Sequence, residues 1–353
     1  MTAAADFGSV LDRWGLADAS VSPLGRGLIN QTYLVEGAQG RFVLQKLSPI
    51  FDPAIHNNIV AVTEHLARKG VASPRLVQAD EGGWWVDTRD QGERGGIWRL
   101  QTALEGVGFE VLEGAGQARV AGEFVGRWHG ALRDLDHEFE ALRVGVHDTP
   151  RHLARLREAV EEGRGHRLHD AVAPLAEAIL EGAESLPAIP ASVRPRPSHG
   201  DLKINNLLFT GEGEAAQALA LIDLDTVAPM TLAYELGDAW RSWCNRAGED
   251  EAQARFDLEI FAASWAGWSK GWGDAGGGAL DAEERRSLLA GPEWISLELA
   301  ARFAADALFE SYFGWDAARF PGRGEHNLHR ARGQWSLHEA VLASRPARAD
   351  LLG

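Results

Sequence analysis

The feature that most constrains the fold is a change in the spacing of apolar residues near residue 105. From about residue 20 to residue 100, short β-type runs dominate, and QTYLVE and RFVLQKL are separated by the turn segment GAQG. Two further strand-like runs are WWVDT and IWRLQ. Between these pairs, HNNIVAVTEHLARKG has helical spacing and ends at Gly70. The region therefore predicts a small β-sheet with one inserted helix.

After residue 106 the pattern becomes mainly helical. In ARVAGEFVGRWHGAL, apolar residues recur every four positions and give one apolar helix face. The exception is 198–227, where NNLLF and ALALIDLDT read as short strands joined by the turn GEGEAA. We expect an α+β fold with a small β-sheet N-terminal lobe, residues 1–104, and a larger, mainly helical C-terminal lobe, residues 105–353.

Composition and charge exclude several classes of function. Hydrophobic residues make up 45% of the chain and charged residues 24%, a balance typical of a folded globular protein. The formal net charge is −16, so nucleic acid and anionic membranes are poor candidate partners. The single cysteine, Cys244, can form no internal disulfide, and no run of 18 apolar residues or basic leader occurs. We therefore expect a cytoplasmic protein; the oligomeric state is left open.

The segment SHGDLKINNLLF carries the strongest chemical signal. Asp201 and Asn206 have the spacing of the kinase catalytic loop, in which the aspartate is the base and the asparagine binds magnesium. Lys203 follows the proposed base by two residues, where an ammonium group can neutralise charge on a transferring phosphoryl group. We expect His199 to hold the loop in place without taking part in the chemistry.

A second acidic cluster, LIDLD, follows at hairpin distance. Magnesium prefers hard oxygen ligands, and Asp223 is the natural supplier of a second one. If the strand continues, Asp225 shares a face with Asp223 and reaches a second metal or the acceptor. The alternative is a polar turn in which these side chains only cap backbone groups. A turn alone gives no reason for the second acidic cluster, so we favour the kinase interpretation.

HGDLKINN and LIDLD resemble the aminoglycoside phosphotransferase and choline kinase group of small-molecule kinases, whose members share a protein-kinase-like bilobal fold. Stretches along almost the whole chain are most similar to the bacterial N-acetylhexosamine 1-kinases, which use ATP and magnesium. These stretches are GRGLINQTYLV, RFVLQKL, VHDTP, IDLDTVAP, ELGDAWR, ARFAADALFESYF and HNLHRARGQ. The resemblance implies a nucleotide-binding lobe followed by a catalytic and substrate-binding lobe.

The same resemblance implies roles for individual residues. Asp201 would be the base, and Asn206 and Asp223 would be the magnesium ligands. Asp238, in LGDAWR, would brace the catalytic loop. The residues that would lie near the sugar are Arg302 and Asp306.

The nucleotide-binding cation is left open between two neighbouring residues. Kinases present a strand lysine to the α- and β-phosphates and pair it with a helix glutamate. The resemblance aligns that lysine with Gln45, whereas charge favours Lys46, with Glu64 as its partner, and strand alternation allows only one of the two to face the cleft. In LGRG, two glycines can let the loop approach phosphates, because they add no side chain: Gly25 and Gly27.

We therefore predict a transferase of carbohydrate metabolism that uses ATP and Mg²⁺ to phosphorylate a sugar at its anomeric hydroxyl. From residue 321 to the end, five arginines oppose three acidic residues, which argues against a polycationic acceptor. One alternative is a kinase of another small alcohol, such as an aminoglycoside, choline or homoserine. Another is a nucleotide-binding module without turnover.

Overall fold

The predicted N-terminal hairpin lies within an antiparallel sheet of the computed structural model, which describes residues 7–25, 29–90, 92, 95–143, 145–211 and 213–353. The strand order is β1-β2-β3-β6-β4, and β5 also pairs with β6. The bounds are β1 Ser20–Pro23, β2 Gln31–Gly37, β3 Gly40–Lys46, β4 Leu76–Val77, β5 Val86–Asp87 and β6 Ile97–Thr102. The predicted inserted helix is α2, Ile55–Arg68.

The two faces of this sheet differ in character. One face packs against the N-terminal helices α1 (Gly8–Leu11) and η1 (Asp12–Trp14) in a core that includes Leu44, Trp98 and Leu100. On the other face, Gln45 and Arg99 are register partners on β3 and β6, and both side chains are buried. Side chains that alternate along a strand therefore separate an apolar face from a polar one.

The chain divides into two compact units, and the first unit is discontinuous. It comprises residues 1–105 together with 134–143 and 220–225, whereas the division predicted at residue 104 places both short segments in the second lobe. Hydrogen bonds within the unit explain their membership. Asp134 accepts hydrogen bonds from α2, and Asp225 accepts one from Asn30. Such contacts join residues far apart in the sequence, so strand and helix patterns do not reveal them.

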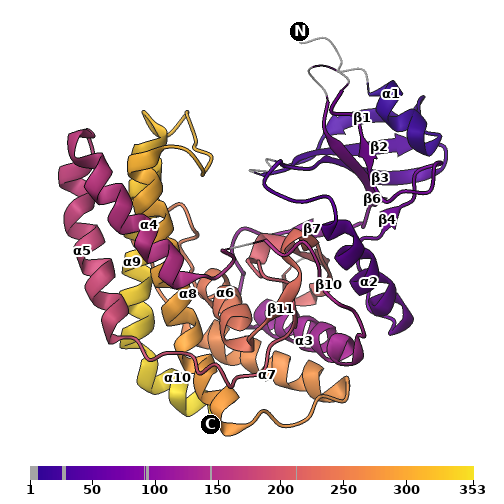
Figure 1. Cartoon of the computed structure of the whole chain (residues 1–353). Coiled ribbons are helices and arrows are strands. Elements are labelled where there is room, and N and C mark those ends of the chain that lie inside the picture. The colour runs from indigo at the N-terminus through magenta and orange to yellow at the C-terminus, as the bar shows by residue number, and fades with distance from the viewer. Residues whose placement is uncertain (1–6, 26–28, 91, 93–94, 144, 212) are drawn as a thin grey trace. The chain divides into compact units, whose positions relative to one another are not determined.

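The second unit is mainly helical, as predicted. Helices α4, α5, α8 and α9 share one hydrophobic core and run alongside one another in Figure 1. The helices are α3 Ala115–Ala131, α4 Thr149–Glu162, α5 His169–Ser185, α6 Leu232–Trp243, α7 Leu258–Asp274, α8 Ala282–Phe309, α9 Arg323–Ala343 and α10 Arg345–Leu352. Short 3₁₀ helices are η3 Leu132–Asp134, η4 Gly163–Gly165, η5 Ile204–Asn206, η6 Gly213–Ala215 and η7 Leu224–Thr226.

Helices α3 and α7 approach each other at glycines on both partners. A Cβ atom added to Gly126 would lie 2.2 Å from the carbonyl oxygen of Trp268, and one added to Gly271 would lie 2.0 Å from that of Glu123. Gly122 and Gly267 make equally close approaches. No side chain fits at these distances, so glycine is required for this helix pair to form.

Short strands carry the predicted polar clusters. Strand β9, Leu207–Thr210, lies between β7, Val107–Gly108, and β10, Gln217–Leu221. A separate antiparallel pair joins β8, Arg196–Ser198, to β11, Ala228–Met230. The expectation that the strand continues through Asp225 is wrong, because β10 ends at Leu221 and η7 begins at Leu224.

Candidate active site

The predicted catalytic loop leaves β8 at Ser198 and enters η5 at Ile204. Gly200, which stands where the kinase loop has arginine, has φ +79°, and a Cβ there would lie 2.6 Å from the carbonyl oxygen of Thr226. Both its conformation and the lack of space therefore require glycine. The Thr226 hydroxyl also donates to the His199 carbonyl at 2.8 Å. These contacts fix the turn that precedes Asp201.

A buried glutamate that the sequence interpretation missed holds the loop backbone. Glu235, on α6, accepts the backbone N–H of His199 at 2.8 Å and that of Gly200 at 2.9 Å. His129 Nε2 lies 3.0 Å from the same carboxylate, and its Nδ1 accepts the Trp268 indole N–H at 3.0 Å. Burial raises the pKa of Glu235, but the hydrogen bonds and charges of His129 and His199 together outweigh it, so the pKa is lowered. Glu235 is thus an ionised clamp on the loop.

The predicted base makes its contacts within the loop. Asp201 Oδ2 lies 2.9 Å from Lys203 Nζ and accepts the Asn206 amide N–H at 2.9 Å. Burial would raise the pKa of Asp201, but Lys203, together with His199 and Arg241, lowers it to about 2. The side chain is 31% exposed. Asp201 is therefore an ionised carboxylate that water can reach at neutral pH.

Asn206, a predicted metal ligand, is hydrogen-bonded to the predicted base. Its Nδ2 donates to both the carbonyl oxygen and the carboxylate of Asp201, at 2.8 and 2.9 Å. This arrangement occupies the amide nitrogen and leaves Oδ1 as the hard oxygen that a magnesium ion prefers. The structure thus brings together three residues of the predicted site: Asp201, Lys203 and Asn206. The two aspartates of LIDLD, Asp223 and Asp225, belong to the other unit.

The predicted brace, Asp238, makes a different contact. Its Oδ1 accepts two N–H groups of Arg241 at 2.9 and 3.1 Å, and Arg241 also contacts Glu249. Glu235, three residues earlier in the same helix, makes the hydrogen bonds to the loop backbone. Asp238 therefore fixes Arg241, which in turn helps to lower the pKa of Asp201.

The two aspartates of LIDLD have different environments. Asp223 has φ +63°, a left-handed conformation that costs a non-glycine residue about 1–3 kcal/mol, and strain of this kind clusters at functional sites. Asp225 is buried, and its carboxylate binds Arg99 through one oxygen and the Asn30 amide, at 2.6 Å, through the other. Burial would raise the pKa of Asp225, but Arg99 outweighs it and lowers the pKa. The expected role of Asp225 as a metal ligand therefore conflicts with its hydrogen bonds.

The two candidates for the nucleotide-binding position on the strand, Gln45 and Lys46, have different register partners in the structure. Lys46 lies opposite Trp98 in register, and its Nζ is 5.8 Å from the centre of that ring. The expected pair with Glu64 does not form: among the described residues, Lys46 has no ion pair. Gly25 has φ +70° and open space at its Cβ position, and Gly27 lies outside the described residues.

The two residues expected near the sugar, Arg302 and Asp306, have different environments. The Asp306 carboxylate accepts the backbone N–H groups of Ser311, Tyr312 and Phe313 at 2.8–2.9 Å and the Asn327 amide at 2.9 Å. Its role in the structure is therefore to hold the loop after α8, and these bonds conflict with sugar binding.

Arg302, in contrast, lies in the electrostatic field of a buried cluster that includes the VHDTP segment. His147 contacts Glu298 at 3.3 Å and stacks on Tyr234 with ring centres 5.9 Å apart. Its Nε2 is buried without a hydrogen-bond partner among the described residues. Burial would lower the pKa of His147, but Glu298 outweighs it and raises the pKa.

Ion pairs weaken the charge argument from the C-terminal segment. Arg330 pairs with Asp250, while Arg345 and Arg348 both pair with Glu293. These three arginines are therefore balanced by acidic residues outside the segment, which weakens the argument from its local charge.

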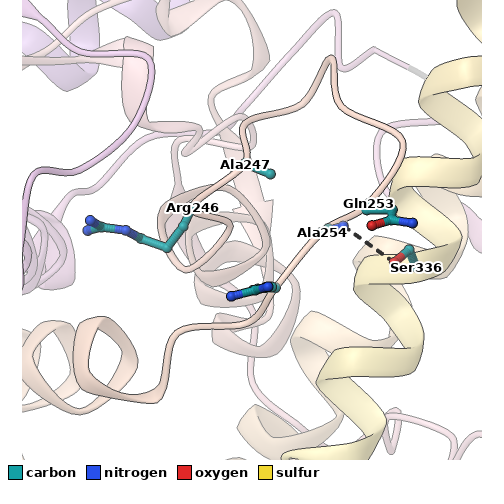
Figure 2. Close-up of a pocket in the computed structure, with 6 residues that line it drawn as sticks. Arg246, Ala247, Gln253, Ala254 and Ser336 are labelled. Carbon is teal, nitrogen blue, oxygen red and sulfur yellow. Dashed lines mark hydrogen bonds between the residues drawn. The ribbon is translucent and has the colours of Figure 1, made fainter.

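A surface pocket of about 500 Å³ lies apart from this chemistry. It is lined by Arg246, Ala247, Gln253, Ala254, Arg255 and Ser336. Figure 2 shows Ser336 on its helix, accepting the backbone N–H of Ala254 at 3.3 Å. None of the predicted catalytic or metal-binding residues lines this pocket, so we do not assign it as the active site.

Across the described segments, no helix is both long and apolar enough to cross a membrane.

Comparisons with known proteins identify similar sequences and similar solved structures. A homoserine kinase from Beijerinckia indica subsp. indica is 27% identical over 242 residues, which are 68% of this chain and 66% of that relative. A microcompartment-associated aminopropanol kinase has a TM-score of 0.63 at 17% identity, covering 96% of this chain and 97% of its own.

The amicoumacin kinase hAmiN, solved with AMP-PNP, Ca²⁺ and Ami, has a TM-score of 0.59 at 12% identity, covering 96% of this chain and 94% of its own. At these identities the solved structures establish the fold. The model of the phosphotransferase enzyme family matches residues 20–270, about seven tenths of the chain. The chain therefore belongs to the phosphotransferase enzyme family, whose protein-kinase-like fold it adopts.

Proposed function

We propose that this protein is an ATP- and magnesium-dependent kinase that phosphorylates a hydroxyl group of a small molecule. The observation that carries the proposal is the clustering of Asp201, Lys203 and Asn206 on a loop whose backbone Glu235 holds. Phosphoryl transfer needs a carboxylate that orients the acceptor hydroxyl and accepts its proton. Asp201, ionised and partly exposed, has both properties.

The reaction follows from these groups. Asp201 takes the proton of the acceptor hydroxyl as its oxygen forms a bond to the γ-phosphorus of ATP, and the bond from that phosphorus to the oxygen of ADP breaks. Lys203, next to the base, offsets negative charge that gathers there. Asn206, by its hydrogen bonds to Asp201, keeps the carboxylate in one orientation.

Two residues fit the expected metal. Asn206 has its amide nitrogen occupied and its Oδ1 left as an acceptor, and Asp223 has the strained backbone typical of a functional site. When bound, magnesium would neutralise the nucleotide phosphates. We leave Asp225 out of the ligand set, because Arg99 and Asn30 occupy its carboxylate.

The acceptor that we place first is an N-acetylhexosamine or a related hexose, phosphorylated at its anomeric hydroxyl to give a sugar 1-phosphate. The resemblance of VHDTP and HNLHRARGQ to the sugar 1-kinases supports this choice. Arg302 and the buried cluster around His147 offer hydrogen-bonding groups that a polyhydroxylated acceptor could use.

Homoserine is the second candidate, favoured by the similarity to the Beijerinckia homoserine kinase. An aminoglycoside, choline and an aminopropanol complete the panel of acceptors. We expect ATP consumption with one acceptor class, and a phosphorus NMR spectrum of the product distinguishes a sugar 1-phosphate from other phosphate esters. Loss of turnover in Asp201→Asn with the same acceptor ties the activity to this loop.

A nucleotide-binding module without turnover would give a different result. Such a protein would bind ATP and magnesium but release no phosphorylated product with any acceptor on the panel. That outcome would contradict the kinase proposal, while leaving the nucleotide site intact.

A further inference from the structure

The positive charge that kinases present to nucleotide phosphates does not come from the expected strand position in this chain. Kinases use a lysine on the third strand for this purpose. Here the two candidate positions, Gln45 and Lys46, point to opposite faces of the sheet, because side chains alternate along a strand. Only one of these faces carries the polar groups of the unit.

Lys46 lies on the apolar face. Its register partner is Trp98, whose ring belongs to the core with Leu44, Leu100 and the N-terminal helices. Lys46 Nζ lies 5.8 Å from the centre of the Trp98 ring. A cation–π contact with this ring therefore stabilises the positive charge of the lysine. This lysine therefore faces the wrong side of the sheet to meet the acidic cluster at 223–225.

Gln45 lies on the polar face, but it is neutral and fully used. Its Oε1 accepts N–H groups from Arg99 Nε at 2.9 Å, Arg99 Nη2 at 2.7 Å and Gln101 Nε2 at 2.9 Å. Its Nε2 donates to the Thr32 hydroxyl at 3.1 Å. Gln45, which the resemblance aligns with the kinase lysine, therefore fixes the guanidinium of its register partner, Arg99, by hydrogen bonds.

Arg99 links this strand position to the acidic cluster. Its Nη1 donates to Asp225 Oδ1, and the other oxygen of Asp225 accepts the Asn30 amide. Asp225 lies two residues after Asp223, the proposed metal ligand. A guanidinium has five N–H groups, and the described residues accept three of those of Arg99. Two donors on a fixed, planar cation are left for another acceptor.

A purely structural pair is a weak explanation for this arrangement. The side chains of Arg99 and Asp225 are each 2% exposed. Burying two charges costs as much as their attraction returns, and apolar replacements of such pairs are often as stable. His56 is a further cost, because burial and then Arg99 lower its pKa to about 4, and its Nε2 is buried without a partner among the described residues.

We propose that Arg99 takes the place of the kinase strand lysine and donates to the phosphates of the nucleotide, with Gln45 and Asp225 fixing its guanidinium. The inference rests on the proposed kinase function. A planar guanidinium held in place is better organised for binding a phosphate than an ammonium group on a flexible side chain. The positive charge at the phosphate site is thereby supplied from β6 instead of β3.

The test compares variants that keep the buried charges balanced. The wild-type protein serves as the reference, and Arg99→Met/Asp225→Asn removes the cation together with its buried partner, so neither protein holds an unpaired buried charge at this site. Thermal unfolding confirms that each variant folds. If the methionine variant does not fold, Arg99→Gln/Asp225→Asn keeps hydrogen-bonding groups at both positions and serves instead.

The readout is equilibrium binding of ADP, measured by calorimetry with and without Mg²⁺, alongside adenosine. We expect the Kd for ADP to rise about 10- to 100-fold between the reference and the variant lacking Arg99, with and without the metal, because the phosphates lose a charged hydrogen-bond donor. Adenosine binding should not change. Arg41→Met, at an exposed arginine on the neighbouring strand β3, is the matched control and should leave the Kd unchanged.

A rescue variant sharpens the assignment. Adding Gln45→Lys to Arg99→Met/Asp225→Asn restores a cation at the register partner, so we expect ADP affinity to recover in part.

Equal ADP affinity with and without Arg99 would overturn the inference. A loss of affinity seen only with Mg²⁺ would also overturn it, since that pattern means Arg99 acts through the metal ligands. A large loss in Lys46→Met would assign the phosphates to that lysine instead. If the wild-type protein bound no nucleotide, the proposed function itself would fail.

Discussion

Each of the two units holds an aspartate–cation pair, and the two pairs are built in opposite ways. Asp201 and Lys203 are two residues apart, with side chains 31% and 32% exposed. Asp225 and Arg99 are 126 residues apart, with side chains 2% exposed. An exposed pair contributes little to stability but can reach a substrate, whereas a buried pair is costly to break. The comparison separates the proposed base from groups that fix a position.

Removing the reactive carboxylate should have the largest effect on turnover. Asp201→Asn keeps the size and hydrogen-bonding shape of the side chain but removes the base. We expect kcat to fall by about 10²- to 10⁴-fold. Steady-state kinetics with the identified acceptor measure this change, and thermal unfolding checks that the fold is retained. An unchanged kcat would show that another group accepts the proton.

Breaking the buried pair should have the largest effect on stability. Arg99→Met alone leaves Asp225 as an unpaired buried charge, and we expect the free energy of unfolding to fall by about 3–5 kcal/mol. Lys203→Met, at the exposed pair, should lower it by less than about 1 kcal/mol. Urea denaturation of both variants gives the two values. Similar losses would mean that burial does not distinguish these pairs.

The clamp on the catalytic loop should have an intermediate effect. Glu235→Gln replaces one carboxylate oxygen with an N–H group that faces a backbone or imidazole donor, so a buried donor loses its acceptor. We expect the free energy of unfolding to fall by about 1–3 kcal/mol. Amide hydrogen exchange at His199 and Gly200 should quicken. The matched control is Glu249→Gln, at a glutamate that is 41% exposed and contacts Arg241.

The smallest effect concerns pH. Lys203 is the main group that lowers the pKa of Asp201 to about 2, against the effect of burial. In Lys203→Met this pKa should rise, so protonation would inactivate the base at a higher pH. The acid limb of the kcat profile should therefore move to higher pH than in the wild-type protein. A limb that stays in place would show that Lys203 does not set the charge of Asp201.

The sequence predicted local features well, because spacing along the chain determines them. The β2–β3 hairpin, helix α2 and the grouping of Asp201, Lys203 and Asn206 all depend on residues close together in the chain. Partners distant in sequence could not be predicted. Nothing in the composition of ELGDAWR distinguishes Glu235 from Asp238 as the residue that binds the loop backbone.

The same limit explains the other differences. Arg99 was missed because its importance comes from register with Gln45 and a bond to Asp225. Asp306 was assigned to the sugar, but the loop after α8 folds back onto its carboxylate. The early end of β10 follows from the turn at Asp223, whose left-handed backbone no strand pattern indicates.

The glycine contact between α3 and α7 has a practical consequence for anyone who alters this protein. Helix α3 carries His129, which contacts both Trp268 of α7 and Glu235, so the spacing of the two helices is passed on to the catalytic loop. A library of random substitutions should therefore yield inactive clones at Gly122, Gly126, Gly267 and Gly271, which contribute no functional group to the reaction. Engineering of this protein should therefore leave these four positions untouched.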